Sequence, residues 1–167
     1  LVIYQQATAG IIIAGSILSA RALAPVDLAI ANWKSFAAAR QSWRRLTRLL
    51  AFFPAAFTGV CTAEMCAFSE DYDAFASTDT VVLPVSVDNV PALREFKRKE
   101  GLAVELLSDL KRDVSRAYGT LNEERFVSGR AYVLIDRNGV VRWTFAEVTP
   151  GTRRENSELL AQLAALG

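Results

Sequence analysis

The sequence predicts an α/β domain over residues 50–167, preceded by a separate helical segment over residues 1–49. Three observations predict this arrangement. β-rich apolar runs alternate with helical patterns in the second part, an Asn-Gly pair separates two late strand-like runs, and the first 20 residues carry no charged side chain. The alternation indicates a parallel sheet covered by helices, whereas the uncharged stretch indicates a segment of another kind.

Residues 1–20 are long enough for a membrane span, since about 20 apolar residues cross a bilayer. A buried helix of a water-soluble protein explains the same stretch, because Gln, Ser and Thr residues dilute its apolar character. The helical pattern that continues to Arg45 is basic, and such a helix either lies at a cytoplasmic membrane surface or presents a solvated face. The sequence therefore leaves both a membrane-associated and a water-soluble first segment open.

The second part of the chain shows strand and helix patterns in a regular order. One helical pattern opens with Pro and closes with Gly, as helices prefer, and the Asn-Gly pair predicts a hairpin near the end. The strand patterns cover residues 46–53, 81–88, 104–109, 130–136 and 140–148, and the helical patterns cover residues 62–76, 91–101, 114–121 and 155–166. Alternating strands and helices, followed by a hairpin and a last helix, are typical of a thioredoxin-like domain.

The composition excludes several kinds of catalytic site. The chain has no histidine, which excludes Ser-His-Asp and Cys-His nucleophile pairs and imidazole bases. Its two cysteines are too few for a structural zinc site or a disulfide framework, and we expect no cofactor. The formal net charge of +1 does not indicate a nucleic-acid partner. Any thiolate chemistry must therefore rely on backbone dipoles and cationic side chains.

Cys61 lies between the strand pattern that ends at residue 53 and the helical pattern that begins near Thr62. At such a position the first N–H groups and the positive end of the helix dipole point towards the sulfur. Together with a nearby arginine, these groups stabilise a thiolate, the nucleophilic form of cysteine. The alternative is an inert cysteine that fills space in the core.

The residues around this cysteine carry a more specific signal. The stretch PAAFTGVC, from Pro54 to Cys61, resembles the active-site signature of the peroxiredoxins, and the flanking AFF and TAEMCAF strengthen the match. The resemblance covers residues 50–167 and is strongest to the alkyl hydroperoxide reductase E-like and bacterioferritin-comigratory-protein-like groups. It implies a thioredoxin-like fold, here without the family's usual N-terminal strands, and a thiol-dependent peroxidase activity.

The resemblance also implies a role for each matching residue. Cys61 would attack a peroxide oxygen as the thiolate and become a sulfenic acid, while Thr58 would orient the peroxide. Pro54 would shield the sulfur from water. Arg130, just before the strand pattern AYVLID, would stabilise the thiolate and the departing oxygen, and Glu64 would orient this arginine.

Cys66 matches the resolving cysteine of some peroxiredoxins, which lies five residues after the peroxidatic one. On an intact helix five residues rise about 7.5 Å and turn about 140° away, whereas a disulfide needs Cα atoms within about 7 Å. Resolution by Cys66 therefore requires the first turn of the helix to unwind. The alternative is a residue on a buried helix face, with an external thiol resolving the sulfenic acid.

Residues 7–46 resemble a different family. The segment is similar to the last membrane-helix region of type I secretion ABC exporters, most specifically in RALAPVDLAIANW. The chain has no GxxxxGK[ST] loop, so the sequence does not support nucleotide hydrolysis. The alternative to an active peroxidase is therefore a chimeric or truncated chain, inactive as a peroxidase, that carries an exporter-derived membrane segment.

The peroxiredoxin resemblance also implies partners. We expect a hydroperoxide as substrate and, as reductant, a thioredoxin-like protein or a low-molecular-weight thiol. A homodimer, and membrane contact through residues 1–45, are further expectations. The expected location is the cytoplasm, or the inner membrane if the first segment attaches there.

Overall fold

The computed structural model of the chain describes residues 46–149 and 151–166. These residues belong to the second of two compact units into which the chain divides, Arg44–Gly167. The expectations for residues 1–45, including the uncharged stretch and the basic helix, lie outside the described residues. Within the described ranges, none of the helices has the length and apolar character needed to cross a membrane.

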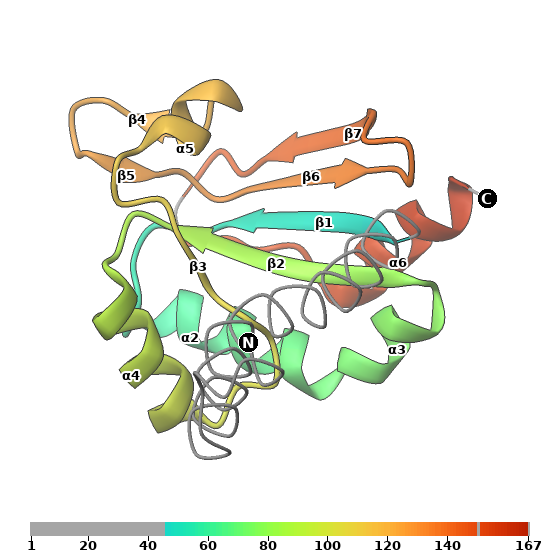
Figure 1. The fold of residues 1–167 in the computed structure, drawn as a ribbon, viewed down its shortest axis with the longest axis horizontal. Helices are drawn as coiled ribbons and strands as arrows, with labels where there is room; N and C mark the ends of the chain where they lie inside the picture. The colour runs from blue at the N-terminus through green and yellow to red at the C-terminus, as the bar shows by residue number, and fades with distance from the viewer. Residues whose placement is uncertain (1–45, 150, 167) are drawn as a thin grey trace, which may run out of the picture. The chain divides into compact units, whose positions relative to one another are not determined.

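The centre of the described unit is a five-stranded mixed sheet with the strand order β3-β2-β1-β6-β7 (Figure 1). Its strands are β1 (Thr47–Phe52), β2 (Thr80–Ser86), β3 (Leu107–Ser108), β6 (Ala131–Ile135) and β7 (Val141–Ala146). β1 is parallel to β2 and antiparallel to β6, while β2 is also parallel to β3. The strand predicted directly before the cysteine loop therefore takes the central position in the sheet.

Alternate residues of β1 face opposite sides of the sheet, because side chains along a strand point to its two faces in turn. Leu49 and Ala51 contribute to one buried apolar cluster, and Leu50 and Phe52 contribute to the other. The first cluster also contains side chains from the helices on one side of the sheet in Figure 1, which are α2 (Gly59–Glu70), α3 (Tyr72–Ser77), α4 (Val90–Glu100) and α6 (Asn156–Ala165). On the other side, the ring of Tyr118 lies 5.7 Å from that of Phe52. β1 is thus buried on both faces, as expected of a continuous apolar run.

The helix that follows β1 differs from the prediction at both ends. It starts at Gly59, because Thr58 has an extended backbone and takes the N-cap position, although its side chain makes no capping hydrogen bond. Cys61 is therefore the third residue of α2 and does not precede the helix as predicted. The single helix expected over residues 62–76 is also divided, because Asp71 leaves the helical conformation and α3 follows it.

The remaining elements follow the predicted order, several with shorter bounds. α4 starts where the Asn89 side chain accepts a backbone hydrogen bond, and it ends before Gly101, whose φ of 64° is left-handed. β3 and α5 (Asp113–Ala117) are shorter than their patterns, and the Asn-Gly hairpin between β6 and β7 is confirmed. A second hairpin, of β4 (Leu121–Asn122) and β5 (Val127–Ser128), is absent from the prediction because two-residue strands show no detectable period.

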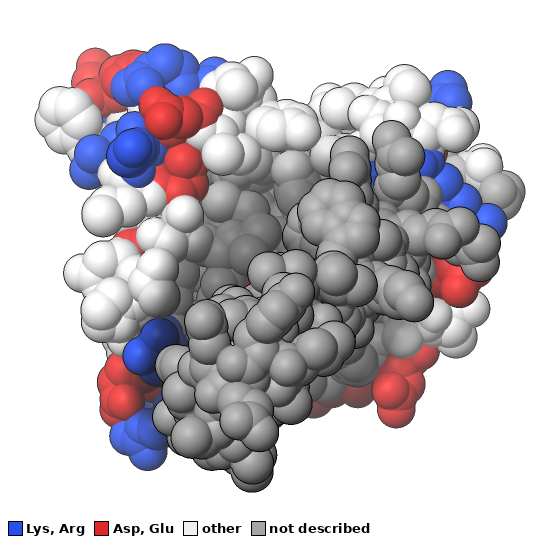
Figure 2. Space-filling view, viewed as in Figure 1, with Lys and Arg blue, Asp and Glu red and all other residues white. Residues whose placement is uncertain are grey.

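Charged side chains of opposite sign lie side by side on the surface that the described residues form (Figure 2). Examples are the ion pairs Lys97–Glu105, Arg98–Glu95 and Arg116–Glu123. Exposed pairs of this kind are screened by water and contribute roughly 0–1 kcal/mol each. The stability of the unit therefore depends mainly on the two apolar clusters.

Candidate active site

Cys61 lies in the first turn of α2, at the positive end of the helix. The first backbone hydrogen bond of the helix runs from Thr62 N to Thr58 O at 2.8 Å. The N–H groups of residues 59–61 thus lack partners within the helix, and together with the helix dipole they favour negative charge at this end. Cys61 is almost fully buried, with 2% of its surface exposed, so water competes little for its sulfur.

Arg130 reaches Cys61 from the residue just before β6, far away in the chain. Its Nη2 donates to Cys61 Sγ at 3.4 Å, and its Nη1 donates to Glu64 Oε2. Burial lowers the pKa of the Arg130 guanidinium, but the neighbouring Glu64 and Cys61 raise it above its usual value. A permanent positive charge therefore contacts the sulfur.

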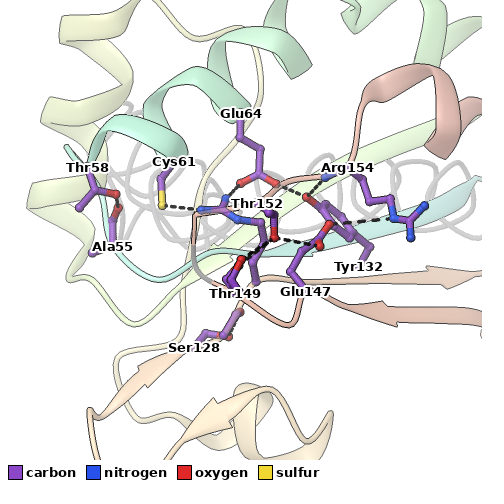
Figure 3. A network of polar contacts seen from close by, with 12 residues as sticks. Ala55, Thr58, Cys61, Glu64, Ser128, Tyr132, Glu147, Thr149, Thr152 and Arg154 are labelled. Carbon is purple, nitrogen blue, oxygen red and sulfur yellow. Dashed lines mark hydrogen bonds and ion pairs between the residues drawn. The ribbon is translucent and has the colours of Figure 1, made fainter.

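Glu64 lies one turn after Cys61 on the same face of α2, since residues three apart on a helix are neighbours. Figure 3 shows both side chains directed towards one network of polar contacts. Glu64 is 1% exposed, and burial raises the pKa of its carboxyl above the usual value. The charge of Arg130 opposes this rise most strongly, followed by hydrogen bonds from Tyr132 and Arg130 and by the charge of Arg153. The carboxylate thus has a donor on each of its oxygens.

Tyr132 belongs to this network but is absent from the predicted site. Its hydroxyl donates to Glu64 Oε1 at 2.5 Å and accepts a hydrogen bond from Arg154 N at 3.1 Å. Burial and the charge of Glu64 raise the pKa of the phenol, so the hydroxyl stays protonated. A signal was available in the sequence, because Tyr132 lies two residues after Arg130 and side chains two apart on a strand share a face.

Asp88 ties the loop between β1 and α2 to the end of β2. Ala56 N and Ser86 Oγ both donate to Asp88 Oδ2, at 2.8 and 2.9 Å. Because β1 and β2 are parallel, their carboxyl ends meet at one edge of the sheet, where sites of α/β proteins are commonly found. Asp88 is also absent from the predicted site, although its position at the end of the apolar strand pattern over residues 81–88 was a usable signal.

Pro54 and Thr58 lie in the loop that Asp88 holds. Pro54 is half-buried, and Thr58 is the N-cap of α2. The Thr58 hydroxyl donates to Ala55 O, with 3.0 Å between the two oxygens. Figure 3 marks this contact with a dashed line. Thr58 would therefore have to exchange this bond in order to orient a bound molecule near the sulfur.

Cys66 lies on the same helix as Cys61, and both are free thiols. Helix α2 continues without interruption through both positions. Burial raises the pKa of the Cys66 thiol, and the carboxylates of Glu100 and Glu70 raise it further. Cys66 therefore lies on an intact helix together with Cys61, and its raised pKa keeps the thiol protonated at neutral pH.

The assembled network consists of a thiol, a guanidinium, a carboxylate and a phenol, all from the chain itself. Among residues 46–149 and 151–166, no group of three His, Cys, Asp or Glu side chains is arranged to hold a metal ion. A guanidinium next to a thiol at a helix N-terminus can stabilise negative charge on the sulfur and on an atom that leaves from it. This arrangement suits nucleophilic displacement at an electrophile with an anionic leaving group.

Comparison with known proteins places this geometry in a family context. A family model described as the AhpC/TSA family matches residues 32–144. The chain is similar to alkyl hydroperoxide reductase E of Mycobacterium tuberculosis, with 36% identity over 121 residues that cover 71% of this chain and 78% of the relative. It is also similar to the structure of the reduced 2-Cys peroxiredoxin of Plasmodium vivax, with a TM-score of 0.68, 31% identity, and coverage of 76% of this chain and 68% of that one. These similarities confirm the predicted thioredoxin-like fold and the resemblance to alkyl hydroperoxide reductase E.

A second similarity concerns a shorter stretch of the chain. Over 56 residues, the chain is 66% identical to the type I secretion system ATP-binding protein PrsD of Rhizobium meliloti, which covers 34% of this chain and 10% of that relative. The match confirms the predicted resemblance to an exporter of this type. Because so little of the relative is covered, no transport activity follows from it.

Proposed function

The chain belongs to the AhpC/TSA family and is a thiol-dependent peroxidase, and we propose that Cys61 is its nucleophile and passes through a sulfenic acid. The contact of Arg130 Nη2 with Cys61 Sγ, at 3.4 Å in the first turn of α2, carries this proposal. A cation and a helix N-terminus together favour the thiolate, and only the thiolate is strongly nucleophilic. The substrate class is a hydroperoxide, in keeping with the name of the mycobacterial relative.

In the first step the Cys61 thiolate attacks one oxygen of the peroxide. A sulfur–oxygen bond forms, the oxygen–oxygen bond breaks, and the sulfur gives up two electrons to the peroxide. The departing alkoxide or hydroxide takes up a proton and leaves as an alcohol or water. Arg130 stabilises both the thiolate and the departing oxygen, because its charge lies next to the atoms between which negative charge moves.

The other predicted residues act around this step. Glu64 fixes the guanidinium of Arg130 through the ion pair between Oε2 and Nη1. Thr58 orients the peroxide after its hydroxyl exchanges the bond to Ala55 O, and Pro54 limits access of water to the sulfur from the loop. Burial of Glu64 and Arg130 supports the role of this ion pair, because fixed charges act more strongly where water is excluded, whereas Thr58 is exposed.

For the return to the thiol, an external thiol is the better-supported reductant. It condenses with the Cys61 sulfenic acid, which releases water and forms a mixed disulfide, and a second thiol then reduces this disulfide. Two features of Cys66 favour this route over an internal one. The helix that carries both cysteines is continuous, and the pKa of the Cys66 thiol is raised, so less of its thiolate forms at neutral pH.

The second candidate function is an inactive chimera that carries an exporter-derived segment, and the similarity to PrsD is the observation that favours it. Under this hypothesis residues 1–49 attach the chain to a membrane and the peroxidase site is a remnant. Three expectations stay predictions. They are the division of the chain near residue 50, a homodimer, and a cytoplasmic rather than membrane-associated location. Partitioning of the full chain after cell lysis tests the membrane attachment.

The experiment for the proposed function measures hydrogen peroxide consumption by the full chain with dithiothreitol as reductant. Dimedone in a parallel sample traps the sulfenic acid, and peptide mass spectrometry locates the adduct. We expect wild-type turnover and an adduct on Cys61, with both lost in Cys61→Ser. Cys66→Ser is the matched control, because it makes the same substitution on the same helix, and it should keep both signals.

Two results would count against the proposal. Turnover that persists in Cys61→Ser would exclude this cysteine as the nucleophile. A Cys61–Cys66 disulfide in peroxide-treated wild-type protein, together with loss of turnover in Cys66→Ser, would instead establish Cys66 as the resolving cysteine and replace the external-thiol route.

A further inference from the structure

We propose that Tyr132 is a positioning residue that keeps Nη2 of Arg130 in contact with the Cys61 sulfur. Its hydroxyl occupies one oxygen of Glu64, so that Arg130 divides its two terminal nitrogens between this carboxylate and the sulfur. The inference rests on the proposed function of Cys61, but its test reads thiol reactivity separately from peroxide reduction.

The two oxygens of Glu64 have different partners. Oε2 accepts from Arg130 Nη1, and Oε1 accepts from the Tyr132 hydroxyl at 2.5 Å. Glu64 is 1% exposed, so water cannot readily replace either donor. A buried carboxylate oxygen without a donor is costly, and each of the two therefore needs a partner from the chain.

The hydrogen bonds of Arg130 differ from the usual pairing of an arginine with a carboxylate. A guanidinium often meets a carboxylate through two parallel hydrogen bonds, because two of its N–H groups match the two oxygens. Arg130 instead directs Nη2 to Cys61 Sγ at 3.4 Å. Without the Tyr132 hydroxyl, Glu64 Oε1 would be left open and would compete with the sulfur for Nη2.

Two features keep the Tyr132 hydroxyl in its donor role. Its oxygen accepts a hydrogen bond from Arg154 N at 3.1 Å, which leaves its hydrogen for Glu64. Burial and the charge of Glu64 raise the pKa of the phenol, so the hydroxyl keeps the proton that it donates to Glu64. The ring is fully buried in the apolar cluster beside α2, and packing therefore fixes the direction of the hydroxyl.

The test compares Tyr132→Phe, which keeps the ring, with Tyr72→Phe at an exposed tyrosine of α3 as matched control. Alkylation of Cys61 by iodoacetamide is followed by peptide mass spectrometry as a function of pH, and oxidation by hydrogen peroxide is measured at neutral pH. In Tyr132→Phe we expect the midpoint of the alkylation profile to rise by about one pH unit and the oxidation rate to fall about tenfold. Tyr72→Phe should match the wild type in both.

A second comparison separates positioning from packing. If Tyr132 acts through Glu64, Tyr132→Phe should add less than about twofold to the rate loss when Glu64→Gln is already present, whereas lost packing would add in full. A measurement on the wild-type chain covers the case in which Tyr132→Phe does not fold. The Tyr132 hydroxyl, buried and bound to a carboxylate, should give a slowly exchanging downfield proton resonance in NMR spectra.

An alkylation profile of Tyr132→Phe equal to that of the wild type would overturn the inference. So would a tenfold loss that persists in the Glu64→Gln background, or a Tyr132 hydroxyl proton that exchanges freely with water. A wild-type chain that reduces peroxide no faster than a free thiol would overturn the proposed function instead, and the alkylation profiles would still decide the role of Tyr132.

Discussion

The two ends of the central sheet hold charged pairs of the same type in opposite surroundings. At the carboxyl end of β1, Arg130 and Glu64 form an ion pair in which each side chain is 1% exposed. At the other end, Arg137 Nη2 and Asp79 Oδ2 lie 3.0 Å apart, with the side chains 57% and 66% exposed. The pairs are chemically alike, so burial is the main difference between them.

The difference teaches where to look for function in this fold. An exposed pair contributes little and can be lost without consequence. Burying a charged pair costs free energy, because two charges are removed from water. Apolar residues at the same positions often stabilise a core equally well, so stability alone does not explain such a pair. A chain that keeps Arg130 and Glu64 buried beside a thiol therefore points to chemistry rather than to stability.

The largest effect is expected from Arg130→Ala. This change leaves the Glu64 carboxylate buried without its cation and removes the positive charge from the Cys61 sulfur. We expect the free energy of unfolding to fall by about 3–5 kcal/mol and the peroxide rate to fall by at least about 100-fold. Urea unfolding and stopped-flow oxidation measure the two effects.

Arg125→Ala, at an exposed arginine of the same unit, is the control for this variant and should change neither quantity. An Arg130→Ala protein with wild-type oxidation rate would show that the buried pair has no part in the reaction. Equal losses in both variants would remove the distinction between buried and exposed arginines.

A smaller effect is expected from Asp88→Ala at the same end of the sheet. The carboxylate accepts hydrogen bonds from Ala56 N and Ser86 Oγ, and its removal frees the loop that carries Pro54 and Thr58. We expect a loss of about 1–3 kcal/mol in the free energy of unfolding and about a tenfold slower oxidation of Cys61. A variant with full activity and unchanged stability would show that the loop holds its position without this carboxylate.

Asp109, a buried acid directly after β3, makes the stability of the fold depend on pH. To the comparison of buried and exposed groups it adds a buried charge that is held by hydrogen bonds. Burial raises the pKa of this carboxyl, whereas hydrogen bonds from Ser115 N and Val114 N lower it. The hydrogen bonds outweigh the burial, so the pKa of Asp109 lies below its usual value. An acid with a lowered pKa in the fold stabilises the fold above its unfolded pKa of about 3.9, and this stabilisation is lost as the pH falls below that value.

Asp109→Asn should therefore be less stable than the wild type near neutral pH, and the difference should shrink at about pH 3. Urea unfolding of both proteins at the two pH values tests this expectation. A difference that stays constant, or grows towards acid pH, would contradict it.

The smallest effect is expected from Arg137→Ala at the exposed end. Its partner Asp79 returns to water when the arginine is removed, so we expect less than about 0.5 kcal/mol of change in the free energy of unfolding. The residual effect should vanish in high salt, because salt screens exposed charges. A loss comparable with that of Arg130→Ala would mean that burial does not distinguish the two pairs.

The fold was largely predictable because its strands are apolar and its turns have specific residues. The Asn-Gly pair predicted the hairpin of β6 and β7, and the apolar run before Pro54 predicted the central strand. The start of α2 was misplaced, because apolar spacing locates a helix but does not fix the residue at which it begins, and the N-cap residue Thr58 makes no side-chain capping bond.

The candidate site was predictable to the extent that it lies in a contiguous motif. The stretch from Pro54 to Cys61 identified the thiol, and Arg130 and Glu64 were assigned by resemblance and do lie together. Tyr132 lies outside this motif, and its one signal, a position two residues after Arg130, is weak because an aromatic residue in a buried strand is typical of a core. The role of its hydroxyl depends on the hydrogen bond to Glu64, which is distant in the sequence. This contact forms when folding brings β6 beside α2.

The most direct test of the central claim is the second-order rate constant for oxidation of Cys61 by hydrogen peroxide in the full wild-type chain at neutral pH. Stopped-flow mixing with site-resolved detection of the oxidised cysteine gives this number. We expect oxidation at least about 100-fold faster than that of free cysteine under the same conditions, which is the scale of stabilisation that a preorganised charge provides. A rate equal to that of free cysteine would contradict the assignment of Cys61 and Arg130 as a peroxide-reducing pair.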